Sequence, residues 1–357
     1  MSRMRFALYL SGMMASRWLM SAIAAVTLIG LLDSLANASD IADRAAELGA
    51  GGATEYLFQR LPIIFDRVLL ITILLAVVLT YVSLVRRREI VALTAAGLSS
   101  TAQVLLLTPV TLLLGLFSLL IVDALMPPAV RALQSWGAPG YVLDRLSQDM
   151  PLWLSDEGRI VRIAEREGPD SFGEIEIYDI GSAGGMAAVT YAEAAHWSED
   201  GGWTLDGTEV VGLTPGAPEP APRWRSDVTP DALDRLISEP RDLSLADMRD
   251  LRSLRGSGSR PSFAYDAWYY HRLTRPLAGL VLVMCCVPLM QRLGRGSNGD
   301  LAMIGCLALG FGYLIFDGVM ISFAEAGASR PAWAVGFPIG LFALLGVYLN
   351  LGRERTR

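Results

Sequence analysis

Six long apolar segments constrain the fold of this 357-residue chain more than any other feature of its sequence. A helix needs roughly 20 apolar residues to cross the hydrocarbon core of a bilayer. Hydrophobic residues make up 52% of the chain and charged residues only 18%, so the composition agrees with several such crossings. We therefore predict a polytopic α-helical membrane protein with six transmembrane helices. The predicted spans are Trp18–Ala38, Leu61–Val85, Val104–Met126, Pro276–Leu293, Leu301–Ala324 and Pro331–Leu351.

Arginines gather at four places that lie on one side of the membrane if each span crosses once. Short cytoplasmic loops retain arginine and lysine, so we expect this side to be the cytoplasm, with both chain ends there. The loop between the first two spans is acidic, and we expect it outside, together with everything between the third and fourth spans. The arginines are Arg3, Arg5 and Arg17 before the first span, Arg86, Arg87 and Arg88 after the second, Arg292 and Arg295 after the fourth, and Arg353, Arg355 and Arg357 after the sixth.

The N-terminal segment allows two interpretations. Arg3 and Arg5, an apolar run and then Ala36-Asn37-Ala38 resemble a cleavable secretion signal with small residues at its cleavage site. The length of the run and Asp33 within it favour a retained span instead. We also expect residues 5–14 to form a helix that lies in the membrane interface before the first span.

Between the third and fourth spans the pattern changes from apolar runs to alternation. Arg159–Ile163 and Glu174–Ile180 alternate polar and apolar residues with a period of two, which is typical of half-buried strands. Ala187–Trp197 and Trp203–Leu213 are further predicted strands, separated by turn-forming residues 199–202. The other predictions for this segment are a loop at 213–222, a helical stretch at 230–254 and a flexible joint at 256–259.

These patterns divide the chain into three parts. An N-terminal membrane half covers residues 1–129, an inserted domain covers 130–265, and a C-terminal membrane half covers 266–357. Short strands in series predict an all-β, jellyroll-like fold for the inserted domain, which is long enough to form a core of its own.

The loop between the second and third spans carries the most distinctive local motif. Arg86, Arg87 and Arg88 precede a short predicted helix that ends at Gly97. A cytoplasmic helix between two spans offers a soluble partner a surface to bind. The alternative is an ordinary short loop whose arginines serve only to keep it in the cytoplasm.

Residue types needed for many enzyme mechanisms are missing. All 30 basic residues are arginines, which excludes a P-loop nucleotide site with its Gly-Lys-Ser/Thr and any Schiff-base lysine. His196 and His271 are too far apart to form a His-Glu-x-x-His zinc motif. Cys285, Cys286 and Cys306 lie in predicted spans and are typical of small apolar packing residues. We expect no catalytic residue, no metal and no cofactor.

Ionisable residues in the spans are the remaining site candidates, because a charge at such depth is by default a functional hypothesis. One interpretation pairs Arg67 with Asp66 or Asp123, and Asp317 with Arg275, to hold helices together. In the other, Arg67 and Arg275 are free and hold phosphate groups of an anionic lipid, since guanidinium matches phosphate bidentately. The candidates for lipid-phosphate or gate residues are Asp66, Arg67, Arg275 and Asp317.

The chain resembles the LptF/LptG lipopolysaccharide export permeases over nearly its whole length. The most specific match is Arg88-Glu89-Ile90-Val91-Ala92-Leu93 followed by Ala96-Gly97-Leu98-Ser99. Weaker matches, in the expected order, are Arg60-Leu61-Pro62, Trp203-Thr204-Leu205, and Tyr270-His271-Arg272-Leu273 running into Arg275-Pro276-Leu277. Leu31-Leu32-Asp33-Ser34-Leu35 and Arg60-Leu61-Pro62 resemble the LptG branch more than the LptF branch.

The resemblance implies a permease subunit of an ABC transporter that extracts lipopolysaccharide from the bacterial inner membrane. Such a subunit pairs with its paralogue, LptF if this chain is of the LptG type, and is driven by a dimer of the ATPase LptB. The inserted domain would be periplasmic and would pass the lipid to LptC and onward to LptA; no nucleic acid is implied. The helix within residues 86–100 would be the coupling helix, with Arg86, Arg87, Arg88, Glu89, Ala92, Leu93 and Gly97 as ATPase-coupling residues.

Two other functional classes remain open from the sequence alone. A membrane-embedded enzyme that modifies lipids would use Asp66, Asp123 or Asp317 in its chemistry. An extracytoplasmic sensor or scaffold is disfavoured because the tail after the sixth span, residues 352–357, holds no output domain. Co-purification of an ATPase discriminates the permease from both alternatives, since neither needs one.

Overall fold

The computed structural model describes residues 3–354 apart from 139, 142–145, 147, 149–150, 157, 169, 181–184, 199–201, 213–222, 225, 227, 254–259 and 294–298. It separates into two compact units. The helical unit comprises Met1–Ala129 and Tyr269–Arg357, and the inserted unit comprises Val130–Trp268. Each unit is described by itself.

Six helices are long and apolar enough to cross a membrane, which confirms the six predicted spans. Several run past the predicted ends, because a helix need not stop where the hydrocarbon does. Thirty-four residues of α1 rise ~51 Å, against a hydrocarbon core of ~30 Å. The helices that contribute to the helical unit are α1 (Arg3–Ala36), α2 (Ala38–Leu48), α3 (Ala50–Arg86), α4 (Glu89–Ala95), α5 (Ser100–Ser135), α8 (Ser262–Leu293), α9 (Gly299–Glu325) and α10 (Pro331–Glu354).

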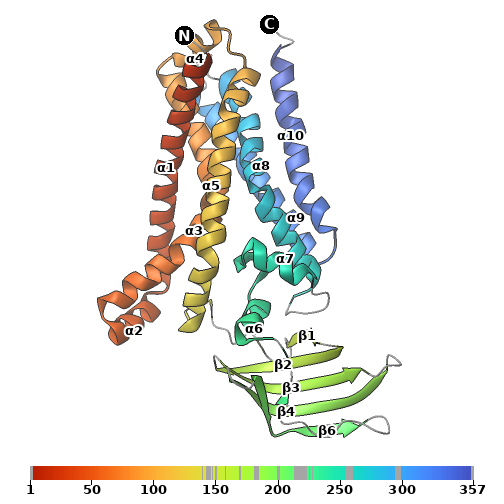
Figure 1. Cartoon of the computed structure of the whole chain (residues 1–357). Helices are drawn as coiled ribbons and strands as arrows, with labels where there is room; N and C mark the ends of the chain where they lie inside the picture. The colour runs from red at the N-terminus through yellow and green to blue at the C-terminus, as the bar shows by residue number, and fades with distance from the viewer. Residues whose placement is uncertain are drawn as a thin grey trace. The chain divides into compact units, whose positions relative to one another are not determined.

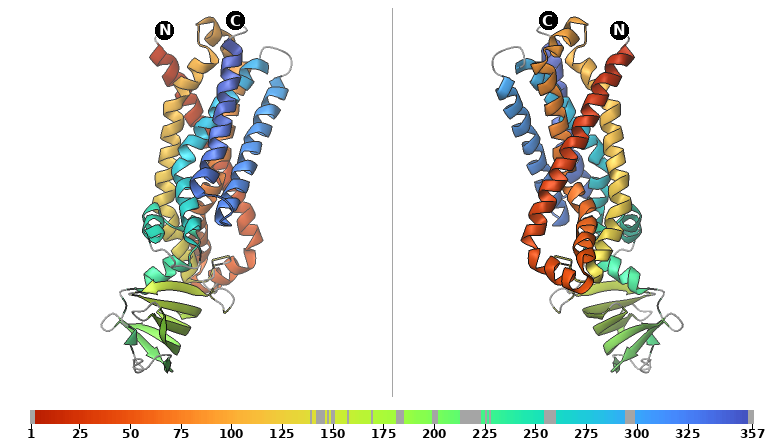
Figure 2. Two further views of the ribbon diagram at one scale, coloured as in Figure 1. Left: turned by 90° about the vertical axis from the view of Figure 1, so that its right-hand side faces the viewer. Right: turned by 90° about the vertical axis from the view of Figure 1, so that its left-hand side faces the viewer.

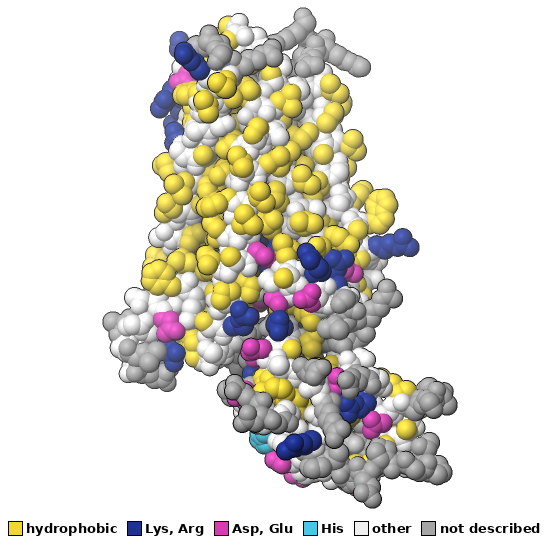
Figure 3. Space-filling view, viewed as in Figure 1, with side chains coloured by type: hydrophobic (Ala, Val, Ile, Leu, Met, Phe, Trp, Pro, Cys, Tyr) yellow, Lys and Arg dark blue, Asp and Glu magenta, His cyan; other side chains and the backbone are white. Residues whose placement is uncertain are grey.

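Helices α3 and α8 form the centre of the bundle. The apolar window of α3 is 67% buried and that of α8 is 61% buried, whereas only 17% of the window of α1 is buried. The start of α1, the short helix α4 and the end of α10 lie at one end of the bundle, and α2 lies at the other (Figure 1; both views of Figure 2). Apolar side chains cover the visible face of the bundle between these ends (Figure 3), as expected for a surface in contact with lipid tails.

The expectation of a separate interfacial helix at residues 5–14 is corrected, because these residues continue into the first span as one helix. Leu10, Met14 and Trp18 follow each other at intervals of four and are all buried in the bundle core. This spacing places them on one face of an α-helix, so the core stripe of α1 extends almost to its N-terminus. Packing, rather than the polar interface, therefore sets the direction of this segment.

The inserted unit contains an antiparallel sheet, which confirms the predicted β region between the third and fourth spans. Its strands run in the order β1-β2-β3-β4-β5-β7, and β6 also pairs with β4. Helices α6 (Pro230–Ile237) and α7 (Leu245–Ser253) and the 3₁₀ turn η1 (Pro240–Asp242) follow the strands. The strands are β1 (Leu152–Asp156), β2 (Arg159–Gly168), β3 (Ser171–Ile180), β4 (Met186–Ser198), β5 (Gly202–Asp206), β6 (Glu209–Gly212) and β7 (Arg223–Trp224).

Two details of the sheet differ from the predicted strands. The single strand expected at Trp203–Leu213 is interrupted at Gly207, whose φ of 62° is a left-handed conformation that favours glycine. The resulting β5 and β6 pair with different parts of β4, so one expected strand becomes two. Strand β1 was not predicted, although its buried and exposed residues alternate regularly. The predicted loop at 213–222, the joint at 256–259 and most of the turn at 199–202 lie outside the described residues.

Candidate functional site

The short helix α4 lies between α3 and α5, within the Arg-rich loop that the sequence singled out. Arg88 precedes it with a φ of 59°, which turns the chain sharply after α3. At the other end Gly97 has a φ of 81°, and the amide of Leu98 donates to the carbonyl of Leu93 (3.1 Å). A left-handed residue followed by this back-bond is a common way to end a helix, and it explains the Gly-Leu pair.

One side of α4 is fixed to the bundle and the other is exposed. Ile90 and Leu93 are buried in the same core cluster that contains residues of α1, α3 and α8. Val91 and Ala92 are exposed, as are all three preceding arginines. The helix therefore presents a small apolar surface, flanked by positive charge, on a rigid support.

Glu89 has two partners around the first turn of α4. The hydroxyl of Tyr9 in α1 donates to its carboxylate (2.7 Å), and Arg87 Nη1 lies 4.0 Å from Glu89 Oε1. Sequence reasoning missed Tyr9, because 80 residues separate it from Glu89 and nothing in its local sequence marks it. The contact links the N-terminal part of α1 to α4.

A second group of charges surrounds the first half of α8, away from the end of the bundle where α4 lies. Three basic side chains within one stretch of α8 each pair with an aspartate from a different helix. Their side chains are at most 13% exposed, so these pairs are formed largely out of water. The pairs are His271 Nε2 with Asp317 Oδ2 of α9 (2.8 Å), Arg272 Nη1 with Asp123 Oδ1 of α5 (3.4 Å), and Arg275 with Asp66 of α3.

The expected ion pairs are thereby corrected. Asp66 forms its ion pair with Arg275 rather than with Arg67, and Asp317 pairs with His271 rather than with Arg275. Arg275 is therefore not free in this structure. Arg67 is exposed and has no hydrogen bond or ion pair with any residue that the structure describes. His271 and Arg275 are four residues apart and lie on nearly the same side of α8, so helix periodicity alone does not tell which aspartate each one meets, and the packing of the neighbouring helices decides it.

A further cluster joins α1 to α3. Asp33 pairs with Arg60, whose Nε donates to Asp33 Oδ2 (2.9 Å). The hydroxyl of Tyr56 donates to the same carboxylate (2.8 Å). Asp33 and Arg60 belong to the two motifs that favoured the LptG branch, and the structure brings them together. The local sequence gave no sign that they touch.

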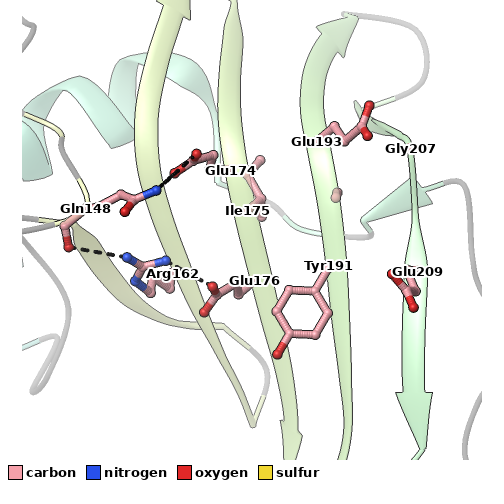
Figure 4. Close-up of a pocket in the computed structure, with 10 residues that line it drawn as sticks. Gln148, Arg162, Glu174, Ile175, Glu176, Tyr191, Glu193, Gly207 and Glu209 are labelled. Atoms are coloured by element: carbon pink, nitrogen blue, oxygen red, sulfur yellow. Dashed lines mark hydrogen bonds and ion pairs between the residues drawn. The ribbon is translucent and has the colours of Figure 1, made fainter.

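The inserted unit has a groove of about 540 Å³ on one face of its sheet (Figure 4). Arg162 of β2, Glu176 of β3, Tyr191 of β4 and Glu209 of β6 stand in register across it. Arg162 Nη1 donates to Glu176 (3.0 Å), and burial together with a hydrogen bond to Glu176 raises the pKa of Tyr178 to about 12. The carboxylates outnumber the one arginine in the lining, so the groove is acidic. Its lining residues are Gln148, Arg162, Glu174, Ile175, Glu176, Tyr191, Ala192, Glu193, Gly207 and Glu209.

The other face of the central strands is apolar. Val161 and Ile163 of β2 and Ile175 and Ile177 of β3 are buried there in alternate positions. No group of three or more His, Cys, Asp or Glu side chains suited to a metal ion occurs among the described residues.

Comparisons with known proteins cover nearly all of this chain. A family model described as lipopolysaccharide export system permease LptF/LptG matches residues 9–351. The chain is 21% identical over 336 residues to the lipopolysaccharide export system permease protein LptG of Escherichia coli strain K12, which covers 91% of this chain and 93% of that protein. The LptG protein of a second Escherichia coli strain gives the same identity and coverage.

Proposed function

This chain belongs to the LptF/LptG family of lipopolysaccharide export permeases, and from that premise we propose that it is an LptG-type subunit of an ABC transporter. As a member of this family with six apolar helices, it is a multi-pass protein of the bacterial inner membrane. In the proposed function it extracts lipopolysaccharide from that membrane and passes it to a periplasmic bridge. The LptG assignment rests on the identity to E. coli LptG and on the motifs around Asp33 and Arg60.

The coupling of this permease to an ATPase is assigned to α4. An LptB-type ATPase dimer binds the surface of Val91 and Ala92, with Arg86, Arg87 and Arg88 as flanking positive contacts. The observation that carries the proposal is the two-sided character of α4. A push on its exposed side is transmitted through buried Ile90 and Leu93 to the core shared by α1, α3 and α8.

The same assignment implies how the chain is oriented in the membrane. If α4 meets a soluble ATPase, the end of the bundle that holds α4 is cytoplasmic, and the inserted unit between α5 and α8 is periplasmic. The retention of arginines in cytoplasmic loops supports this orientation independently. Both chain ends are then cytoplasmic.

Two roles are proposed for the charges of the helical unit. Arg67, exposed and without an ion-pair partner among the described residues, is the candidate for contact with phosphate groups of lipopolysaccharide. The pairs of Asp66 with Arg275 and of Asp317 with His271 connect α8 to α3 and α9. These pairs act as a gate if their partners exchange when ATP hydrolysis moves the helices.

The exposed helix surface and the sheet of the inserted unit each suit a partner of a particular chemistry. A paralogous LptF subunit covers exposed apolar helix surface of the bundle and closes a cavity for acyl chains. The outer edge of β1 has no strand partner among the described residues and is suited to strand addition by LptC, and beyond it LptA. The acidic groove disfavours a lipid that carries phosphates, so this groove is not proposed as part of the lipid path.

The test replaces Ala92 with arginine in the full chain, co-expressed with its ATPase and paralogue. A bulky charge on the exposed side of α4 should weaken ATPase co-purification at least tenfold, about 1.4 kcal/mol, without affecting membrane insertion. Ala92→Ser is the matched control, because serine is small and uncharged and should bind as the wild type does. Lipopolysaccharide release from proteoliposomes should fall in parallel.

The proposal fails if Ala92→Arg retains both ATPase binding and lipid export. It also fails if an accessible cysteine introduced at position 92 reacts with membrane-impermeant reagents from the periplasmic side, because no ATPase could then reach α4.

A further inference from the structure

A second groove of the helical unit, about 570 Å³ in volume, lies beside α1 near α4. It follows one face of α1 over about three turns, as the spacing of its residues indicates. Arg87, which precedes α4, forms its far side. The lining residues are Leu8, Tyr9, Gly12, Met13, Ser16, Arg17, Met20 and Arg87.

Two guanidinium groups line this groove, and neither is neutralised by a close ion pair. Arg17 is half-buried and has no hydrogen bond or ion pair with any described residue. The Arg87 side chain is 63% exposed, and its ion pair with Glu89 is as long as 4.0 Å. Side chains on a helix lean toward its N-terminus, so Arg17 is directed toward the level of Met13 and Arg87.

The remainder of the lining is mostly apolar, apart from the hydroxyl groups of Tyr9 and Ser16. Met13, Met20 and Leu8 provide aliphatic surface next to the charges. Apart from its chain neighbours and the backbone of its own helix, no atom lies within 4 Å of the position that a Cβ on Gly12 would occupy, so its missing side chain leaves free space. Positive charge beside aliphatic surface, at the end of a membrane helix, is the chemistry that binds the phosphate and upper acyl chain of a phospholipid.

We propose that this groove binds an anionic phospholipid of the cytoplasmic leaflet, with its phosphate between Arg17 and Arg87 and an acyl chain along Met13 and Met20. The leaflet follows from the orientation given under the proposed function. The lipid also lies next to Tyr9, which donates a hydrogen bond to Glu89 of α4. Its binding therefore stabilises the contact between α1 and α4 from the membrane side.

Native mass spectrometry of the full chain in detergent, titrated with phosphatidylglycerol, tests this site. Arg17→Gln should reduce retained phosphatidylglycerol about tenfold. Gly12→Leu should do the same by filling the groove while both arginines remain, and it does not weaken the helix, because leucine is a better helix former than glycine. Arg5→Gln is the matched control, since Arg5 is an exposed arginine of the same helix outside the groove.

The wild type should retain phosphatidylglycerol over phosphatidylethanolamine, and inorganic phosphate should not displace it. The proposal would be overturned by equal loss in Arg5→Gln and Arg17→Gln, by no loss in Gly12→Leu, or by displacement of the lipid by inorganic phosphate. Co-purification of a partner helix that crosslinks to position 12 would also overturn it. Because the assay contains neither ATPase nor lipopolysaccharide, a failure of the proposed function would leave the lipid result unchanged.

Discussion

Two groups of arginines in the helical unit lie in opposite surroundings. At the end with α4, Arg86, Arg87 and Arg88 are exposed. Near the other end, the side chains of Arg272 and Arg275 are 4% and 13% exposed, and each pairs with an aspartate. The first group costs little to keep in water and is available to a soluble partner or a lipid headgroup. Burying the second group carries a desolvation cost, and the carboxylate paired with each guanidinium offsets that cost.

This difference explains why the sequence alone indicated a role for Arg86, Arg87 and Arg88 but did not reveal the partners of Arg272 and Arg275. An exposed charge acts through its place in the chain, since loop length and sign alone determine on which side it stays. A buried charge acts through its neighbour. The stability of the bundle should therefore depend strongly on one set of arginines and weakly on the other.

The largest effect is expected for Arg275→Met. It leaves the carboxylate of Asp66, whose side chain is 11% exposed, without its ion-pair partner, at a cost of about 3–5 kcal/mol. The measurement is the free energy of unfolding in detergent micelles. The double variant Arg275→Met with Asp66→Leu should recover most of the loss, because an apolar pair replaces the charged one. If the single variant is as stable as the wild type, the pair does not hold the helices.

A smaller effect is expected for Tyr9→Phe, which removes the hydroxyl that donates to Glu89. A single hydrogen bond contributes about 0.5–1.5 kcal/mol, and exposure places this one near the lower limit. Hydrogen exchange of the amides of residues 89–97 should become about two- to fivefold faster. In a Glu89→Ala background the same substitution should have no further effect, and an equal effect in both backgrounds would contradict the assigned contact.

The smallest effect is expected for Arg86→Gln. Arg86 is exposed, so the free energy of unfolding should change by no more than about 0.5 kcal/mol. The measurement is the same detergent unfolding curve used for Arg275→Met. If Arg86→Gln lowered the free energy of unfolding as much as Arg275→Met does, the exposed and the buried arginines would not differ in their contribution to stability.

Local sequence predicted elements better than it predicted contacts. The six spans and the antiparallel strands follow from apolar length and from alternation, both of which act within a few residues. The interruption at Gly207 was missed, because one glycine within an alternating run does not show by itself whether its φ is positive. The partners of Asp66 and Asp317 were mispredicted, because several basic residues were equally available in the sequence.

The sequence by itself determined that this chain crosses a membrane six times, carries an inserted β region and has groups of arginines at four places beside its spans, since hydropathy and charge act segment by segment. Only the tertiary structure decided that Tyr9 contacts Glu89, that Asp33 contacts Arg60, and which aspartate pairs with each of the α8 residues His271, Arg272 and Arg275. These contacts depend on how helices far apart in the chain rotate and approach each other. That geometry is set by packing over the whole bundle and is not encoded in any one segment.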